Sequence, residues 1–169
     1  MIQKVTSGGQ TGVDQAALRA AKAAGIPTGG YTPRDWLTED GPAPWLADYG
    51  LVALKTPEYQ VRTRACVLDA DGTLIVAARL PLTGGTALTD RYCHRERKPS
   101  FHVAVAAGPD APGWAAECAA AVAEVVGFVE RHAVRVLNVA GPRESKCPGI
   151  GARAEAFLSA LFTQLRSRS

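Results

Sequence analysis

Short apolar runs alternate along this chain with longer segments of helical periodicity, and this alternation restricts the folds that are open to it. Strands are predicted over residues 2–6, 26–30, 73–77, 101–106 and 134–139. Helices are predicted over residues 15–24, 58–68, 86–97, 114–131 and 152–165. Strands that alternate with helices form parallel sheets through right-handed crossovers. We therefore expect a doubly wound α/β domain with a mainly parallel sheet of about five strands.

The length and composition favour a single domain over residues 1–169. A chain of 169 residues with 47% hydrophobic content can bury a core without disulfides or structural metals. Residues 31–57 are rich in Pro, Gly, Trp and acids and show no clear period, so we expect an irregular insertion there. Such a segment can serve as a lid or a subunit contact, and short helical turns are the alternative.

Charge and cysteine content exclude several classes of protein. The net charge of +3 and the pI near 8.8 come from scattered basic residues, which favours anionic ligands and does not predict nucleic-acid binding. The four cysteines form no CxxC motif, so neither a zinc site nor a disulfide framework is predicted. No export signal and no membrane-spanning apolar run is recognised, so we expect a cytoplasmic protein without a membrane partner.

Three of the predicted strands end in loops of small residues. These loops are 7–12 (SGGQTG), 82–86 (LTGGT) and 140–145 (AGPRES). The carboxyl ends of parallel strands meet at one edge of a sheet, so the loops should lie together. If the strand order is 2-1-3-4-5, the first two loops flank a crevice between the first and third strands.

The glycine-rich loops have the chemistry of an anion site. Glycines let backbone N–H groups approach a phosphate, and a following helix adds the positive end of its dipole. The candidate cofactor-binding residues are Gly8, Gly9, Gln10, Thr11, Gly12, Asp14, Arg79, Thr83, Gly84, Gly85, Thr86, Gly141, Arg143, Glu144 and Ser145. Alternatively these are only tight turns, in which Thr11 and Asp14 form a capping box and Thr86 is an N-cap.

The common nucleotide motifs do not fit. No lysine follows Gly12, and no GxGxxG motif with a ribose-binding acid is present, which argues against an ordinary NTPase or dinucleotide site. Arg79 and Arg143 can each make bidentate contacts with phosphate or remain solvated. Glu144 can act as a general base or form an ion pair with Arg143, and we favour the ion pair. The expected ligand is an anionic small molecule that carries a phosphate.

Three strings carry a family resemblance over nearly the whole chain. They are residues 8–14 (GGQTGVD), 83–86 (TGGT) and 138–145 (NVAGPRES). With them the sequence resembles the family of putative molybdenum carrier proteins. The resemblance implies a Rossmann-like fold, relatives that assemble as homo-oligomers, and binding of molybdenum cofactor, a pterin with an anionic phosphate and molybdenum oxo groups.

Three kinds of function remain open at this point. The first is a binding or carrier protein for molybdenum cofactor without catalysis. The second is an enzyme that cleaves the N-glycosidic bond of a nucleoside monophosphate, with Glu144 or Asp14 assisting water. The fold is also similar to that of the lysine-decarboxylase-like nucleotide phosphoribohydrolases, although residues 83–86 match only part of their PGGxGTxxE loop. The third is a structural subunit that uses residues 31–57 as its contact surface.

Overall fold

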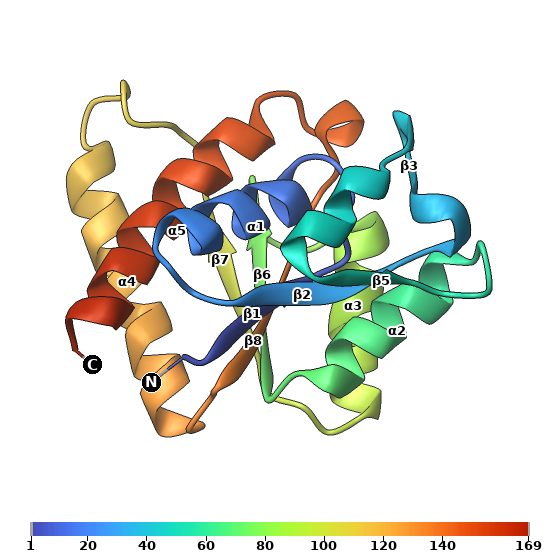
Figure 1. Ribbon diagram of the computed structural model, residues 1–169. Helices are drawn as coiled ribbons and strands as arrows, with labels where there is room; N and C mark the ends of the chain where they lie inside the picture. Colours follow the sequence, from blue (N-terminus) through green and yellow to red (C-terminus); the bar gives the residue numbers. More distant parts are fainter. Residues whose placement is uncertain (1, 169) are drawn as a thin grey trace.

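A six-stranded parallel sheet forms the centre of the computed structural model, which describes residues 2–168 (Figure 1). The strands are β1 (Lys4–Ser7), β2 (Thr28–Thr32), β5 (Leu51–Ala53), β6 (Gly72–Ala77), β7 (Ser100–Ala104) and β8 (Val136–Ala140). Every neighbouring pair in the order β5-β2-β1-β8-β6-β7 is parallel. The predicted α/β class and parallel sheet are confirmed, with one strand more than expected.

Helices cover both faces of this sheet (Figure 1). One face carries α1 (Val13–Ala23), α4 (Trp114–Arg131) and α5 (Ile150–Ser167), and the other carries α2 (Tyr59–Asp69) and α3 (Gly84–Arg95). Alternating strand residues such as Val5, Leu74 and Leu137 join the main apolar core with α1, α4 and α5. The stripe predicted for the last helix is buried, as expected for a helix that covers a sheet.

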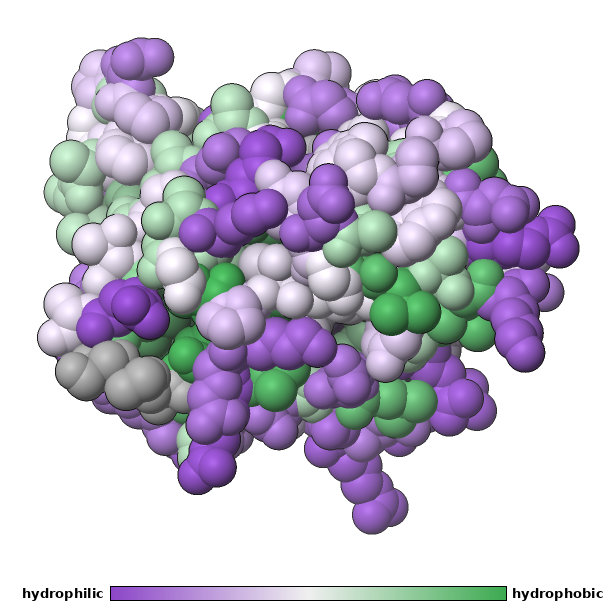
Figure 2. Space-filling view, viewed as in Figure 1, coloured by the Kyte–Doolittle hydropathy of each residue, from purple (hydrophilic) through white to green (hydrophobic). Residues whose placement is uncertain are grey.

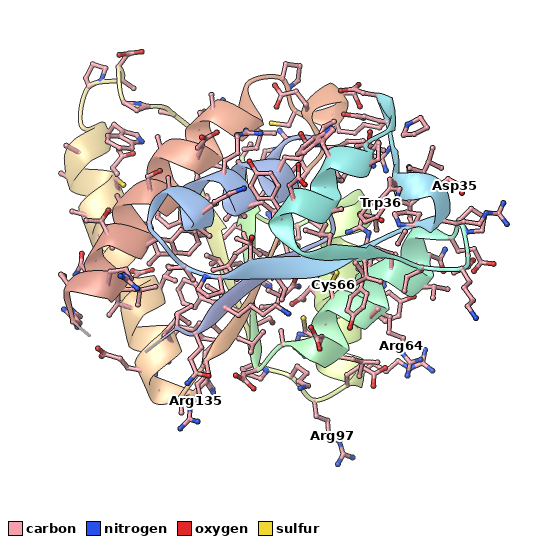
Figure 3. All side chains as sticks on the ribbon, viewed as in Figure 1. Asp35, Trp36, Arg64, Cys66, Arg97 and Arg135 are labelled. Atoms are coloured by element: carbon pink, nitrogen blue, oxygen red, sulfur yellow. The ribbon has the colours of Figure 1, made fainter. Side chains whose placement is uncertain are left out.

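The opposite face of the sheet is polar where it meets α2 and α3. Thr6, Asn138 and Thr73 lie side by side on β1, β8 and β6, and all three are buried. Helix α2 buries few side chains, among them Cys66, which lies between the helix and the sheet, whereas Arg64 points away from the body of the protein (Figure 3). This face of the sheet therefore carries a row of buried polar side chains.

The predicted strand order is wrong at one point. The last strand, β8, inserts between β1 and β6, so the first and third predicted strands are not neighbours. A strand that is buried on both faces shows no alternation in its sequence, and its place in the sheet is then set by tertiary packing. As a consequence, the loop after β8 lies between the two glycine-rich loops.

The segment 31–57 is more regular than its sequence predicts. It contains two 3-10 helices (Arg34–Trp36 and Pro44–Tyr49), an antiparallel hairpin of β3 (Leu37–Thr38) and β4 (Gly41–Pro42), and the edge strand β5. Leu46 and Leu51 anchor it in a small apolar cluster with Leu18 of α1. Each element is too short to produce a recognisable period, which explains why helical turns were only an alternative at the sequence level.

Hydrophilic residues cover most of the face shown in Figure 2. Within residues 2–168, none of the helices combines the length and the apolar character that a membrane span requires.

Candidate functional site

A cavity of about 630 Å³ opens at the carboxyl edge of the sheet. Its walls come from the loop after β1, from α2, from the β6–α3 loop and from the loop after β8. Ala77 and Ala140, the last residues of β6 and β8, line its base. The size lies in the range of small-molecule sites, and the place is where open α/β sheets bind ligands.

The structure divides the predicted site residues into two groups. Those that line the cavity are Gln10, Asp14, Arg79, Thr83, Gly84, Gly85, Thr86, Gly141 and Arg143. Those that do not line it are Gly8, Gly9, Thr11, Gly12, Glu144 and Ser145. Most of the second group make contacts that join the loops to one another.

The first glycine-rich loop, residues 7–12, is filled from inside the protein. The backbone N–H of Gln10 donates to Asp14 Oδ2 at 3.3 Å, and that of Thr11 donates to Gln10 Oε1 at 3.0 Å. Helix α1 begins after Gly12, which makes no side-chain cap bond, so the alternative capping box of Thr11 and Asp14 is wrong. The N–H groups of Gln10 and Thr11 that would face a phosphate in this loop already have acceptors.

The glycines of this loop are required by close packing. A Cβ atom on Gly8 would lie 1.6 Å from Arg62 Nη1. Gly12 has a φ of +74°, and a Cβ atom there would lie 2.5 Å from the carbonyl oxygen of Pro142. Only glycine fits such positions without displacing its neighbours. These glycines thus hold loops together, whereas the sequence predicted that they approach a ligand.

The second glycine-rich loop, residues 82–86, and residues 79–81 before it form an open segment, loop 79–86. No heavy atom lies within 4 Å of a Cβ atom built on Gly84 or Gly85. Helix α3 begins after Thr83, which is the N-cap residue in place of Thr86, and Thr86 Oγ1 donates to the Thr83 carbonyl at 2.6 Å. The N–H groups of Gly84, Gly85 and Thr86 have no acceptor within residues 2–168. The first turn of α3 therefore presents free donors at the cavity.

Cationic side chains surround the cavity. They are Arg62, Arg79, Arg143 and Lys146. Arg143 Nε lies 3.8 Å from Glu39 Oε2, and its guanidinium lies 5.4 Å from the centre of the Tyr59 ring. Among the lining residues, all of them within the described range, Asp14 is the one acid. The balance of charge favours an anionic ligand.

Asp14 and Arg62 form a buried ion pair in the cavity wall. Asp14 Oδ2 lies 3.3 Å from Arg62 Nη1, and the two side chains are 5% and 11% exposed. Burial raises the pKa of the Asp14 carboxyl, and the nearby Arg62 guanidinium offsets part of the rise. This is the one hydrogen bond that the Arg62 side chain makes to a residue of the described chain, and Arg62 Nε has no acceptor.

Arg62 is not among the predicted site residues, although it belongs to the helix predicted over residues 58–68. Tyr59, Arg62 and Cys66 follow one another at spacings of three and four residues, which place them on one side of α2. The helical spacing from Tyr59 and Cys66 is the part of this arrangement that the sequence shows, whereas the structure alone shows that Arg62 lines the cavity.

Glu39 and Glu144 join loops and do not face the ligand space. The Glu39 carboxylate accepts hydrogen bonds from Thr11 Oγ1 and from the N–H and hydroxyl of Ser145. Burial alone would raise the pKa of Glu39, but these bonds and the Arg143 charge lower it. The Glu144 carboxylate accepts from the N–H groups of Gly149 and Gly151. The expected ion pair of Glu144 with Arg143 is wrong, since Arg143 pairs with Glu39.

No three His, Cys, Asp or Glu side chains within residues 2–168 are grouped so that they can hold a metal ion.

The comparisons with known proteins agree on the family. Residues 5–162 match the model of the circularly permutated YpsA SLOG family. A crystal structure of a protein from Syntrophus aciditrophicus SB, called "putative molybdenum carrier protein", is 37% identical and superposes with a TM-score of 0.82, covering 95% of this chain and 94% of that one. None of the curated proteins matches the chain. The chain therefore belongs to the circularly permutated YpsA SLOG family.

Proposed function

We propose that this protein binds an anionic, phosphate-bearing small molecule in the cavity, with molybdenum cofactor as the favoured cargo. One observation carries the proposal: the cavity collects hydrogen-bond donors that have no acceptor. Arg62 is buried in its wall with a single hydrogen bond, and the first turn of α3 presents unpaired N–H groups. Buried donors such as Arg62 Nε are almost always paired in proteins, and the exposed N–H groups at the start of α3 are free to bind an anion, so an acceptor-rich ligand would complete this site.

The spacing of the donors favours an extended ligand over a bare oxyanion. The turn of α3 follows β6, whereas Gln10 and Asp14 follow β1, and β8 lies between these strands. Two interstrand spacings separate the two groups by about 10 Å. A phosphate or molybdate ion reaches only one of them, but a phosphate linked to a ring reaches both.

The side of the cavity offers a flat surface to such a ring. The Tyr59 ring lies beside two guanidinium groups, with Arg62 at 5.9 Å and Arg143 at 5.4 Å from the ring centre. Arginine planes and aromatic faces both stack on planar heterocycles. The phosphate would then be held at Gly84–Thr86 and Arg79, as the dipole of α3 favours.

Molybdenum cofactor fits this arrangement because it joins a flat pterin to a phosphate. The name of the Syntrophus aciditrophicus protein, at 37% identity, supports this cargo over other phosphorylated rings. The cavity lacks a set of metal ligands, so the pterin and phosphate would provide the contacts.

A nucleoside monophosphate phosphoribohydrolase is the second candidate. Of its two proposed acids, Glu144 is bonded to backbone N–H groups away from the cavity. Asp14 lines the cavity, so of the two acids it is the one placed to assist water in the cleavage of an N-glycosidic bond. Release of free base from a panel of nucleoside monophosphates would support this enzyme, and no release from any of them would exclude it.

Substitutions of Gly85 test the proposed site. Gly85→Asp leaves the fold intact, because the position is open and an acid in the first helical turn stabilises a helix. It should lower the affinity for molybdenum cofactor by at least about tenfold through charge repulsion. Gly85→Asn, of equal size and without charge, should bind much more tightly than Gly85→Asp.

The matched control is Gly127→Asp in α4, a position that is also free of neighbours within 4 Å and lies outside the cavity. This variant should bind molybdenum cofactor as the unmodified protein does. Binding should be followed by isothermal titration and by the rate at which the cofactor oxidises, because bound cofactor should oxidise more slowly than free cofactor. Equal affinities of Gly85→Asp and Gly127→Asp would overturn the site.

A further inference from the structure

The inner end of the cavity, which we define as Gln10, Asp14 and Arg62, combines one carboxyl group with donors on either side. All three residues line the cavity, and they are 5%, 3% and 9% exposed. The pair Asp14–Arg62 is described above. Such a group of buried polar side chains accepts a ligand only if the ligand's own donors and acceptors match it.

The orientation of the Gln10 amide is determined by its neighbours. Its Oε1 accepts the N–H of Thr11 at 3.0 Å and the N–H of Glu39 at 2.9 Å. The other end of the amide is therefore the nitrogen Nε2, which is buried and has no hydrogen-bond partner among the described residues. Gln10 accordingly contributes a donor to the inner end, as Arg62 does through its unpaired N–H groups.

The pattern excludes the simplest ligand groups. A phosphate at the inner end would place its charge against the Asp14 carboxylate. A group with donors only would leave Gln10 and Arg62 without acceptors. Asp14 Oδ2 already accepts from the Gln10 N–H and from Arg62 Nη1, both at 3.3 Å. The complementary group therefore has adjacent N–H donors for the remaining acceptor capacity of the Asp14 carboxylate and a carbonyl oxygen next to them for Gln10 and Arg62.

We propose that the inner end recognises a 2-amino-4-oxopyrimidine edge, the group of ring N–H, amino and carbonyl that guanine and pterins share. This rests on the proposed function, since it assumes that a phosphorylated ring occupies the cavity. In this arrangement the Asp14 carboxylate, whose Oδ2 keeps its bonds to Gln10 and Arg62, also accepts the ring N–H and the exocyclic amino group. Gln10 Nε2 and Arg62 donate to the carbonyl oxygen, and the phosphate lies at the first turn of α3.

The purines hypoxanthine and adenine match the inner end less well than guanine does. Hypoxanthine keeps the carbonyl and the ring N–H but lacks the amino group, so the Asp14 carboxylate receives one ligand donor in place of two. Adenine presents an amino group where the carbonyl should be, and its ring nitrogen is an acceptor directed at a carboxylate. Sites that hydrogen-bond a polar group discriminate strongly against analogues without it, because their own buried groups are left unpaired.

The first test uses the unmodified full-length protein and isothermal titration with GMP, IMP, AMP, a phosphorylated pterin and inorganic phosphate. GMP should bind at least about tenfold more tightly than IMP and still more tightly than AMP. If the phosphorylated pterin binds more tightly than GMP, the ligand that carries the 2-amino-4-oxopyrimidine edge is a pterin. If GMP binds more tightly, that ligand is a guanine nucleotide. Equal affinities for GMP, IMP and AMP would overturn the proposal and leave the proposed function intact.

The second test is Asp14→Asn, which keeps the size of the side chain but replaces one acceptor with a donor. The preference for GMP over IMP should disappear, with a loss of GMP affinity of about tenfold to hundredfold. Asp48→Asn, at an exposed position, is the matched control and should keep the preference. Thermal melting checks that each variant is folded. An unchanged GMP preference in folded Asp14→Asn would overturn the proposal, whereas failure of molybdenum cofactor and of every panel compound to bind would overturn the proposed function.

Discussion

The two glycine-rich loops look alike in sequence but play opposite parts in the structure. Loop 7–12 is buried, its glycines pack against side chains and backbone, and N–H groups within it donate to Asp14 and Gln10. Loop 79–86 is largely exposed, with open space above its glycines and unpaired N–H groups. Glycine permits close approach in both loops. Other parts of the protein pack against the glycines of the first loop, whereas the space above the glycines of the second loop is empty.

Their surroundings explain the difference. Loop 7–12 follows β1 in the middle of the sheet, where the hairpin residue Glu39, the loop after β8 and α2 all reach it. Loop 79–86 follows β6, whose outer neighbour is the edge strand β7. A carboxylate of the protein, that of Asp14, occupies the place of an anion in the first loop. In the second, the corresponding place is open to a ligand.

The largest difference is expected between Gly12→Ala and Gly85→Ala. At Gly12 the backbone has a positive φ, and an added methyl group would meet the Pro142 carbonyl oxygen. The free energy of unfolding should therefore fall by at least about 3 kcal/mol. At Gly85 the added methyl group meets nothing, and the free energy of unfolding should change by less than about 1 kcal/mol. Urea denaturation measures both. Similar values for the two variants would remove the distinction between a packed and an open loop.

Gly8→Ala should give the next largest effect. The new methyl group displaces the Arg62 guanidinium from Asp14, which leaves a buried carboxylate without its partner and costs about 2 to 3 kcal/mol. In an Arg62→Ala background the clash with Arg62 is absent and only the contact with Asp14 Oδ2 at 2.8 Å remains, so the same substitution should cost clearly less. A double-mutant cycle by urea denaturation tests this. A coupling energy near zero would show that Arg62 does not need the space above Gly8.

Thr11→Val and Thr86→Val compare the hydroxyl groups of the two loops. Thr11 Oγ1 donates to Glu39 and accepts from the Glu144 N–H, so its loss removes one of the three donors to the Glu39 carboxylate and leaves the partly buried Glu144 N–H without its acceptor, which should cost about 2 kcal/mol. Thr86 Oγ1 bonds only the Thr83 carbonyl of its own turn, and its loss should cost about 1 kcal/mol. Differential scanning calorimetry should show a larger fall in melting temperature for Thr11→Val. The reverse order would contradict the comparison.

The smallest effects concern pH, and the two acids at the first loop should act in opposite directions. Glu39 has a lowered pKa, so its contribution is complete above its ordinary value of 4.5 and is lost as the pH falls through the folded value. Asp14 has a raised pKa, so its ionisation destabilises the fold as the pH rises from its ordinary 3.8 through the folded value. Glu39→Gln should flatten the acid loss, and Asp14→Asn should remove the opposite slope. Denaturation midpoints of the unmodified protein and both variants, measured between pH 3 and 8, test this. If the two substitutions change the pH dependence of stability in the same direction, the predicted opposition of Glu39 and Asp14 is wrong.

Local patterns were enough to predict much of the fold and the place of the site. Buried runs such as residues 73–77 and helical stripes such as that of α5 are properties of neighbouring residues, so they can be read directly. The loops at residues 82–86 and 140–145 follow predicted strands, and parallel strands bring such loops to one edge. That edge is where the cavity lies.

Other features depend on contacts between distant residues. Arg62 lies 48 positions from Asp14, and nothing near either residue in the sequence indicates their pairing. Glu39 has the composition of a turn, yet it ties Thr11 to Ser145 across the structure. The strand β5 is too short to show alternation and is recognised only by its pairing with β2.

The sequence by itself determined the α/β class, the parallel strands and the presence of a glycine-rich loop between the first strand and the first helix, because hydrophobic periodicity and glycine act locally. Tertiary structure alone decided which glycine-rich loop remains open. The insertion of β8 beside β1 and the placing of Asp14 and Arg62 against Gly8 fill the first loop, while the exposed end of β6 leaves the second one free. Whether an N–H group is available depends on the acceptor that packs against it, and that acceptor comes from elsewhere in the chain.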